Sequence, residues 1–282
     1  MTTQATARDT ASKQSDAMPA DTCRNRPLQG LHTALAAEVL KGKRSAARKT
    51  ALFSPLPFCL LGLMSSGLIT GGNGPGDVGF NTYGWCWWYT LLLPVAIALV
   101  TTGVAGADVR QKFHGSMSAP VRLRAVWHAK VIYAFALTAV ANFVLALVSS
   151  AIFLLGGNAA GPVASICMAT LLTTSSLWMI PAGLFLTARF GTLAGVAVPL
   201  LVQLAGGIAC YTSNLWWLLP PAAAMRLCSP FAGVAPSGVP LMPGEPFGII
   251  DLVWVAALAV SVTFGLVLAV AGGIWFDKQE VR

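Results

Sequence analysis

The stretch VIYAFALTAVANFVLALVSSAIFLLGGNAAGPVASICMATLLTTSSLWMIPAGLFLTA (131–188) decides the class of this protein. It contains no Asp, Glu, Lys or Arg, and glycines and a proline between Gly156 and Pro162 divide it into two apolar runs. Each run has roughly the 20 residues that a helix needs to cross a bilayer. Because backbone polar groups in lipid must pair within their own segment, we expect two transmembrane helices here.

Elsewhere in the chain, charged residues also lie between the apolar runs, and six spans are predicted in all. Their ranges are 51–69, 85–107, 131–155, 163–187, 193–211 and 252–275. With six crossings, every one of the 18 Lys and Arg residues except Arg226 falls on one side. Since positive charge favours the cytoplasmic side, both termini are predicted to be cytoplasmic, in a cell membrane. The net charge of +8 then reflects topology and gives no support to nucleic-acid binding.

The predicted fold is an all-α integral membrane protein in which an amphipathic interfacial helix precedes six transmembrane helices. We expect a disordered cytoplasmic N-terminus (1–27), the interfacial helix (28–50), a six-helix transmembrane domain (51–276) and a cytoplasmic tail (277–282). The apolar positions of the interfacial helix are Leu28, Leu31, Leu35, Val39 and Leu40, and its polar side holds Glu38, Lys41, Lys43, Arg44, Arg48 and Lys49. This pattern is typical of a basic helix in the headgroup layer, and the alternative is a solvated linker.

The segment 108–130 is the longest predicted cytoplasmic loop. Gly115 and Pro120 punctuate it, so we expect a short helical piece, a turn, and a helix that re-enters the membrane near Pro120. A mixed polar and apolar loop joined directly to two spans is suited to binding a cytoplasmic partner and transmitting its movement to the spans. The alternative is a positively charged topology anchor. The candidate coupling residues are Arg110, Phe113, Met117, Arg122 and Arg124.

The opposite side of the membrane is predicted to be aromatic and nearly free of cations. Its aromatic residues are Trp85, Trp87, Trp88, Tyr89, Trp216 and Trp217, which the pattern assigns mainly to an interfacial belt. The segment 212–250 is rich in proline and too long for a tight turn, so we expect it to fold back as a cap on the membrane surface. Cys86, Cys210 and Cys228 lie toward this side, where one disulfide is an open alternative.

Several kinds of site are excluded by their missing motifs. The sequence has no G-x-x-x-x-G-K-[ST] loop for nucleotide, no H-E-x-x-H or G-x-S-x-G motif, and no Cys spacing that would hold a metal. No charged side chain is predicted inside a span, which disfavours a proton-coupled carrier or an ion pump. Asn142 and Gln203 are the buried polar candidates, and we expect them to hydrogen-bond between helices rather than to contact a substrate.

Four segments together resemble a known family. They are Ala37-Glu38-Val39-Leu40-Lys41-Gly42-Lys43-Arg44-Ser45, Trp87-Trp88-Tyr89-Thr90-Leu91-Leu92-Leu93-Pro94, the loop from Asp108 to Trp127-His128-Ala129-Lys130, and Leu215-Trp216-Trp217-Leu218-Leu219-Pro220 with Met225-Arg226. In their order the chain is similar to the permease subunits of ABC-2 type exporters, and most similar to lantibiotic-immunity permeases. It departs from them at Pro220-Pro221-Ala222-Ala223, where a Pro-Trp-Ser type run is common, and in its long N-terminus.

The resemblance implies a bacterial permease without a cofactor of its own. It would pair with a second permease subunit, identical or paralogous, and with a separate ABC subunit that binds ATP, and it would expel an antimicrobial peptide from the membrane. A cationic amphipathic peptide would be captured from the outer leaflet by aromatic residues and carboxylates, namely Trp88, Trp216, Trp217, Asp77, Glu245 and Asp251. The alternatives are a non-transporting scaffold or sensor partner, and an intramembrane enzyme for which the sequence offers no catalytic residue.

Overall fold

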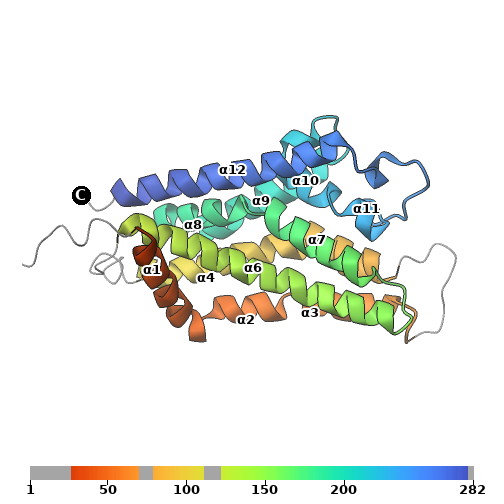
Figure 1. The fold of residues 1–282 in the computed structure, drawn as a ribbon, viewed down its shortest axis with the longest axis horizontal. Helices are drawn as coiled ribbons and strands as arrows, with labels where there is room; N and C mark the ends of the chain where they lie inside the picture. The colour runs from red at the N-terminus through yellow and green to blue at the C-terminus, as the bar shows by residue number, and fades with distance from the viewer. Residues whose placement is uncertain (1–26, 70–78, 111–121, 279–282) are drawn as a thin grey trace, which may run out of the picture.

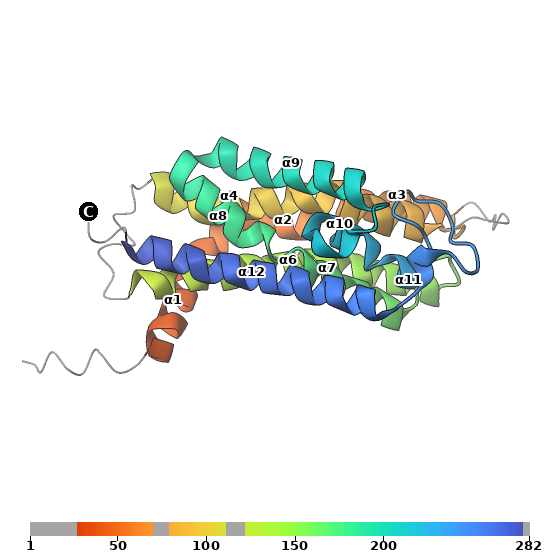
Figure 2. The same ribbon diagram turned by 90° about the horizontal axis from the view of Figure 1, so that it is seen from above.

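The computed structural model describes residues 27–69, 79–110 and 122–278, and these residues form an elongated helical bundle (Figure 1). Within these ranges no strand occurs, and the extended pairing is limited to one isolated bridge between Val234 and Pro240. Long apolar helices run along the bundle (Figures 1 and 2). The predicted all-α class is therefore confirmed.

Five helical stretches in the described part of the chain are long and apolar enough to cross a membrane, so the chain has the character of a membrane protein. They are Asn81–Gly106, Leu123–Leu154, Pro162–Phe190, Thr192–Cys210 and Leu252–Asp277. These match the second to sixth predicted spans. Their helices are labelled α4 (Leu93–Arg110), α6 (Leu123–Leu154), α7 (Pro162–Ser175), α8 (Met179–Phe190), α9 (Thr192–Cys210) and α12 (Leu252–Asp277).

The first predicted span, 51–69, is not one long helix. Two short helices, α2 (Ala46–Phe53) and α3 (Leu56–Ser65), replace it and meet at Ser54 and Pro55. Pro55 and Pro57 have no N–H to donate to the preceding turn, and a proline ring clashes with the carbonyl one turn earlier. The helix therefore breaks there, and the prediction of a continuous helix was wrong at this point. The two pieces still lie end to end along the bundle (Figure 1).

The two ends of the bundle differ in their content, and we call them the basic end and the cap end. The basic end holds α1 (Pro27–Lys41), η1 (Gly42–Arg44) and the beginnings or ends of α2, α4, α6, α8, α9 and α12 (Figure 1). The cap end holds the 155–161 connection and a segment that we call the cap segment, residues 211–251. Among the described cations, Arg226 alone lies in the cap segment.

The cap end is closed by backbone hydrogen bonds between segments far apart in the chain. The Asn158 N–H donates to the Ser66 carbonyl at 2.8 Å, and the Asn158 carbonyl accepts from the Phe80 N–H at 2.9 Å. Asn81 accepts from the Ala160 N–H at 2.9 Å and donates to the Ala232 carbonyl at 2.8 Å. The end of α3, the start of the second span, the 155–161 connection and the cap segment are thereby joined.

The second span begins with a π-helical stretch. Its two parts are η2 (Asn81–Cys86) and η3 (Trp88–Leu92). Trp85, Trp88 and Tyr89 point from it into the core and are at most 1% exposed, whereas Trp87 is 49% exposed. The prediction that these four aromatics form an interfacial belt was therefore wrong for all but Trp87. Buried aromatic surface stabilises the bundle from within instead.

The cap segment does not rest on top of the bundle but enters it. Its short helices are η4 (Trp216–Leu218), α10 (Pro220–Arg226), α11 (Ser229–Ala232) and η5 (Pro246–Gly248). In α10 every residue from Pro220 to Met225 is buried. The Gln203 side-chain amide of α9 donates to the Pro221 carbonyl at 3.0 Å. Gln203 precedes the end of α9 by about two turns, so Pro221 lies beside α9 roughly 10 Å before that helix ends.

Candidate functional site

A buried ion pair joins α1 to α6 at the basic end. Lys130 Nζ lies 2.9 Å from Glu38 Oε1, and the two side chains are only 4% and 5% exposed. Lys41 reaches the same carboxylate oxygen at 3.2 Å from a side chain that is 46% exposed. Lys130 belongs to the spanning helix Leu123–Leu154. Lys130 directly precedes the predicted span 131–155, and a carboxylate from outside the helix neutralises it there.

The face that α1 presents to the bundle differs from the predicted one. Ala34 and Glu38 are buried and Leu31 and Leu35 are partly buried, against the start of α6. Val39 and Leu40 are instead 41% and 70% exposed. Glu38 therefore lies on the packed face, where a partner from α6 compensates its burial, and not on the solvated side. The side chain of Leu28, another predicted apolar position, lies outside the described residues.

Arg48 of α2 makes two hydrogen bonds at the same junction of α1 and α6. Its Nε donates to the Tyr133 hydroxyl at 2.8 Å, and its Nη2 donates to the Val39 carbonyl at the end of α1. Gly42 leaves room for this contact, since a Cβ there would lie 1.9 Å from the Tyr133 hydroxyl oxygen. A charged hydrogen bond of this kind is stronger than a neutral one. Helices α1, α2 and α6 therefore form one fastened corner.

Helix α12 is tied to the start of α6 by two further contacts. Arg124 Nε lies 3.2 Å from Asp277 Oδ2, with side chains 52% and 38% exposed. The Trp127 indole donates to the Ala269 carbonyl at 2.9 Å, and its ring packs against Gly272, where a Cβ would lie 2.2 Å away. The beginning of α6 is consequently in contact with α1, α2 and α12.

The predicted coupling residues fall at or beside this junction. Arg122 is the exposed N-cap residue of α6, and Arg124 lies in its first turn. Arg110 ends α4, although its side chain is outside the described residues, as are Phe113 and Met117. The Glu38–Lys130 pair was missed by sequence reasoning. The spacing of Leu31, Ala34, Leu35 and Glu38 along one helix face was the signal that could have found it.

At the cap end, the predicted aromatic surface is partly occupied by the protein itself. The Arg226 guanidinium lies 4.2 Å from the Trp216 ring centroid and 4.7 Å from that of Phe247, and it donates to the Tyr211 carbonyl at 3.3 Å. Burial lowers the pKa of Arg226, and the Asp251 carboxylate opposes that shift. Trp216 is 8% exposed, whereas Trp217 is partly exposed. Arg226 thus fills the face of Trp216 that a cationic ligand would approach.

Two of the three predicted carboxylates lie in the described part of the chain, and both belong to the cap segment. Asp251 is exposed and caps α12, accepting from the Trp254 N–H at 2.8 Å. Glu245 is partly exposed in the turn before η5, and Asp77 lies outside the described residues. Because a capping carboxylate also stabilises a helix N-terminus, Asp251 has a structural role of its own.

Trp88 is not placed to contact a ligand at the surface. Its indole donates to Asn142 Oδ1 at 2.8 Å, and Asn142 Nδ2 donates to the Thr173 hydroxyl at 2.9 Å, with Trp88 and Asn142 both fully buried. This chain of hydrogen bonds connects η3, α6 and α7. The prediction that Trp88 is an outer contact was therefore wrong, while the predicted interhelical bonding of Asn142 and Gln203 is confirmed.

The contacts described above join helices to one another. The described residues contain no group of three or more His, Cys, Asp or Glu side chains that could hold a metal ion. The five described cysteines, Cys59, Cys86, Cys167, Cys210 and Cys228, are free thiols. What the geometry provides is a fastened corner at one end and a recessed, aromatic segment at the other.

No protein-family model, no curated protein and no solved structure matches the chain.

Proposed function

We propose that this chain is the membrane-spanning permease subunit of an ATP-driven exporter of the ABC-2 type, which expels an antimicrobial peptide from the cell membrane. The observation that carries the proposal is the buried Glu38–Lys130 pair. Breaking a buried pair costs several kcal/mol, so α1 and the start of α6 are expected to move as one body. A force applied at this corner would be passed along α6 into the bundle.

The proposed orientation places the basic end in the cytoplasm. Lys41, Lys43, Arg48, Lys130 and Lys278 belong to that end, as the positive-inside rule requires. We further propose six crossings, with α2 and α3 forming the first. Support comes from their contacts, because Ala47 of α2 packs on Gly103 near the basic end of α4 and Ser65, the last residue of α3, donates to the Gly79 carbonyl at the cap end.

Cysteine accessibility tests this topology. In a background without the partly exposed Cys167 and Cys210, Ser237→Cys should react with a membrane-impermeant thiol reagent added outside intact cells. Ser116→Cys and Ser12→Cys should react only after the membrane is opened. External labelling of Ser116→Cys would overturn the proposed orientation.

The proposed partners are an ABC subunit that binds ATP and a second permease, either a copy of this chain or a paralogue. The ATP-binding subunit would dock on the 108–130 loop, where Phe113 and Met117 supply apolar contacts among cations. The Asp and Trp residues of the opposite side would recruit a cationic, amphipathic peptide, with Trp217 as the accessible aromatic. ATP binding then changes the population of two bundle conformations through the fastened corner.

Reconstitution with an ATP-binding subunit tests the function. The chain should stimulate ATP hydrolysis in proteoliposomes, and cells producing both proteins should survive higher concentrations of peptide. Phe113→Asp with Met117→Asp should abolish both effects while membrane abundance is unchanged; Lys43→Asp is the matched control, since it adds a carboxylate outside the loop. Unchanged hydrolysis and unchanged resistance in the loop variant would refute coupling through this loop. No stimulation by the unaltered chain would favour a scaffold or sensor.

A further inference from the structure

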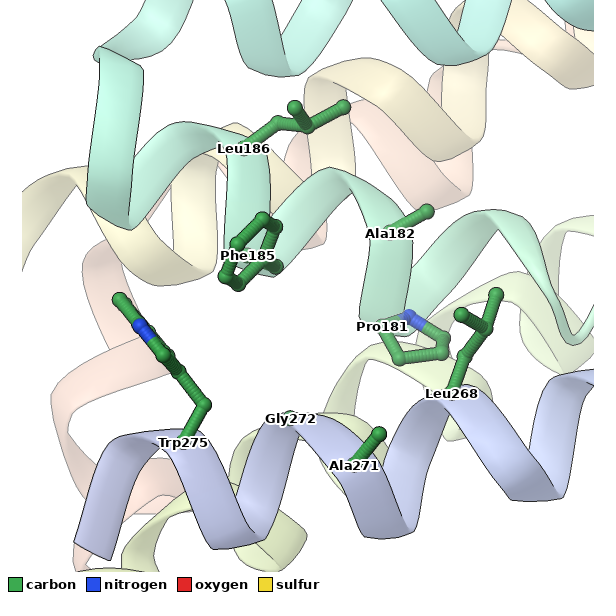
Figure 3. A pocket seen from close by; sticks show the side chains of 8 residues that line it. All are labelled: Pro181, Ala182, Phe185, Leu186, Leu268, Ala271, Gly272 and Trp275. Atoms are coloured by element: carbon green, nitrogen blue, oxygen red, sulfur yellow. The ribbon is translucent and has the colours of Figure 1, made fainter. Parts of the chain in front are cut away.

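An apolar groove lies between α8 and α12 near the basic end (Figure 3). Its volume is about 430 Å³, and it is lined by Pro181, Ala182, Phe185, Leu186, Leu268, Ala271, Gly272 and Trp275. Phe185 and Trp275 form its wall toward the helix C-termini, with ring centroids 4.7 Å apart, and Ala271 and Gly272 form a floor without bulky side chains (Figure 3). The groove offers no charged lining side chain.

The groove is long enough to hold part of an acyl chain. Its lining on α12 runs from Leu268 to Trp275, which is about two turns of helix, or roughly 10 Å. The hydrocarbon core of a bilayer is about 30 Å thick, so the lining extends along about a third of it. An occupant of this groove must therefore be apolar along its length and must reach the headgroup layer at the basic end.

Two cations stand where such an occupant would reach the headgroup layer. Arg189 follows Phe185 at the i+4 position and Lys278 follows Trp275 at the i+3 position, so each extends a lining face by one turn. Both are exposed. Asp277, the carboxylate next to Lys278 in the chain, pairs with Arg124 of α6 at 3.2 Å.

We propose that this groove binds an anionic phospholipid, with an acyl chain between α8 and α12 and its phosphate between Arg189 and Lys278. The C-terminal dipoles of α8 and α12 repel a phosphate, so the two side chains have to outweigh them. Basic pockets between spanning helices at the cytoplasmic surface are suited to anionic headgroups. The inference needs no ATP-binding subunit and stands independently of the transport function.

Brominated lipids, which quench nearby tryptophan, test the proposal because Trp275 lines the groove. The full chain is reconstituted in phosphatidylcholine vesicles containing increasing fractions of dibrominated phosphatidylglycerol or dibrominated phosphatidylcholine. The contribution of Trp275 is the quenching that disappears in Trp275→Phe. We expect it to saturate at a lower mole fraction of the anionic lipid than of the zwitterionic lipid.

Charge variants and a groove-filling variant locate the site. With roughly 1 kcal/mol per basic residue near an anionic surface and 1.4 kcal/mol per factor of ten, Arg189→Gln with Lys278→Gln should weaken the preference by about 25-fold. Ala271→Phe should abolish the saturable component. Lys43→Gln with Lys49→Gln, two exposed cations of the same end, should leave it unchanged, and Val140→Phe, a lipid-facing change elsewhere, should too.

Three results would overturn the proposal. Equal quenching by both lipids would mean that Trp275 meets only bulk lipid. A preference that survives Arg189→Gln with Lys278→Gln would mean that those cations do not hold the phosphate. Quenching by both lipids that falls as the protein-to-lipid ratio is raised would identify a second copy of the chain as the occupant.

Discussion

The basic end and the cap end of the bundle hold their parts together by different interactions. At the basic end, charged side chains bridge separate helices, as Glu38 does to Lys130 and Arg124 does to Asp277. At the cap end, Arg226 lies among aromatic rings, and bonds to backbone carbonyls join the segments. A buried ion pair that loses one partner leaves an uncompensated charge, whereas aromatic and carbonyl contacts are each modest. The basic end is therefore suited to moving as one body, and the cap end to local adjustment.

The largest effect is expected at the buried pair. Lys130→Met leaves the Glu38 carboxylate without its buried partner and should reduce the free energy of unfolding by roughly 3–5 kcal/mol. Denaturation in detergent micelles measures it. Glu38→Met combined with Lys130→Met should recover most of the loss, because no buried charge remains. Lys41→Met, at the exposed end of the same cluster, should cost less than about 1 kcal/mol. A loss of stability in Lys130→Met as small as that in Lys41→Met would contradict the predicted difference between the buried and the exposed lysine.

A smaller effect is expected from packing at the cap end. A Cβ at Gly62 would lie 2.4 Å from the ring of Phe80, which is fully buried. Gly62→Ala should therefore destabilise the bundle by about 1–3 kcal/mol through overpacking. Gly106→Ala is the matched control at the basic end, since its Cβ would meet Thr192 at an ordinary 3.8 Å. Equal stability of the two variants in thermal unfolding would show that the Phe80 ring moves aside without a loss of stability.

The stacking of Arg226 on the Trp216 and Phe247 rings, which we call the aromatic clamp, should contribute still less to the free energy of unfolding. Arg226→Lys keeps the charge but loses the planar stacking on Trp216 and Phe247, and we expect a loss of about 0.5–2 kcal/mol. Faster thiol labelling of Ser237→Cys in that background would report loosening of the cap segment. Arg189→Lys serves as the control, because its guanidinium lies 5.9 Å from the Phe190 ring at an exposed position. Identical labelling rates would show that the aromatic clamp does not restrain the cap segment.

The smallest effect is expected at the exposed pair of the basic end. Arg124→Gln removes the contact to Asp277, and partly exposed pairs of this kind contribute about 0.2–1 kcal/mol. The contribution should shrink further at high salt, because screening weakens interactions between exposed charges. A stability difference that is independent of salt would indicate a packing role for the Arg124 side chain instead.

The sequence was sufficient for the long helices and for the distribution of charge. The apolar runs predicted the second to sixth spans, since a candidate span is recognised from the length and the hydropathy of its own segment. The break at Ser54 and Pro55 was also visible in the sequence, as two prolines within three positions, but average hydropathy concealed it.

The misplaced side chains share one cause. Glu38, Trp85, Trp88 and Tyr89 were assigned by residue type, charge to the surface and aromatics to the interface, although their spacing puts them on packed helix faces. The recessed position of α10 had no comparable signal. It depends on tertiary contacts such as that of Met225 with Gly207, where a Cβ would lie 2.6 Å from the Met225 methyl carbon.

The hydrogen bonds around Asn158 and Asn81 have a consequence for biosynthesis. Ser66 and Phe80 belong to the part of the chain that leaves the ribosome first, yet their backbone partner is Asn158, and Asn81 further requires Ala232. In the proposed six-crossing topology, the first helical hairpin would therefore enter the membrane with these groups still hydrated, and it would gain its partners only as later segments are translated. Truncated nascent chains that end before the 155–161 connection should accordingly retain protease-sensitive ends at Ser66 and Phe80, whereas chains extending past Ala232 should be protected.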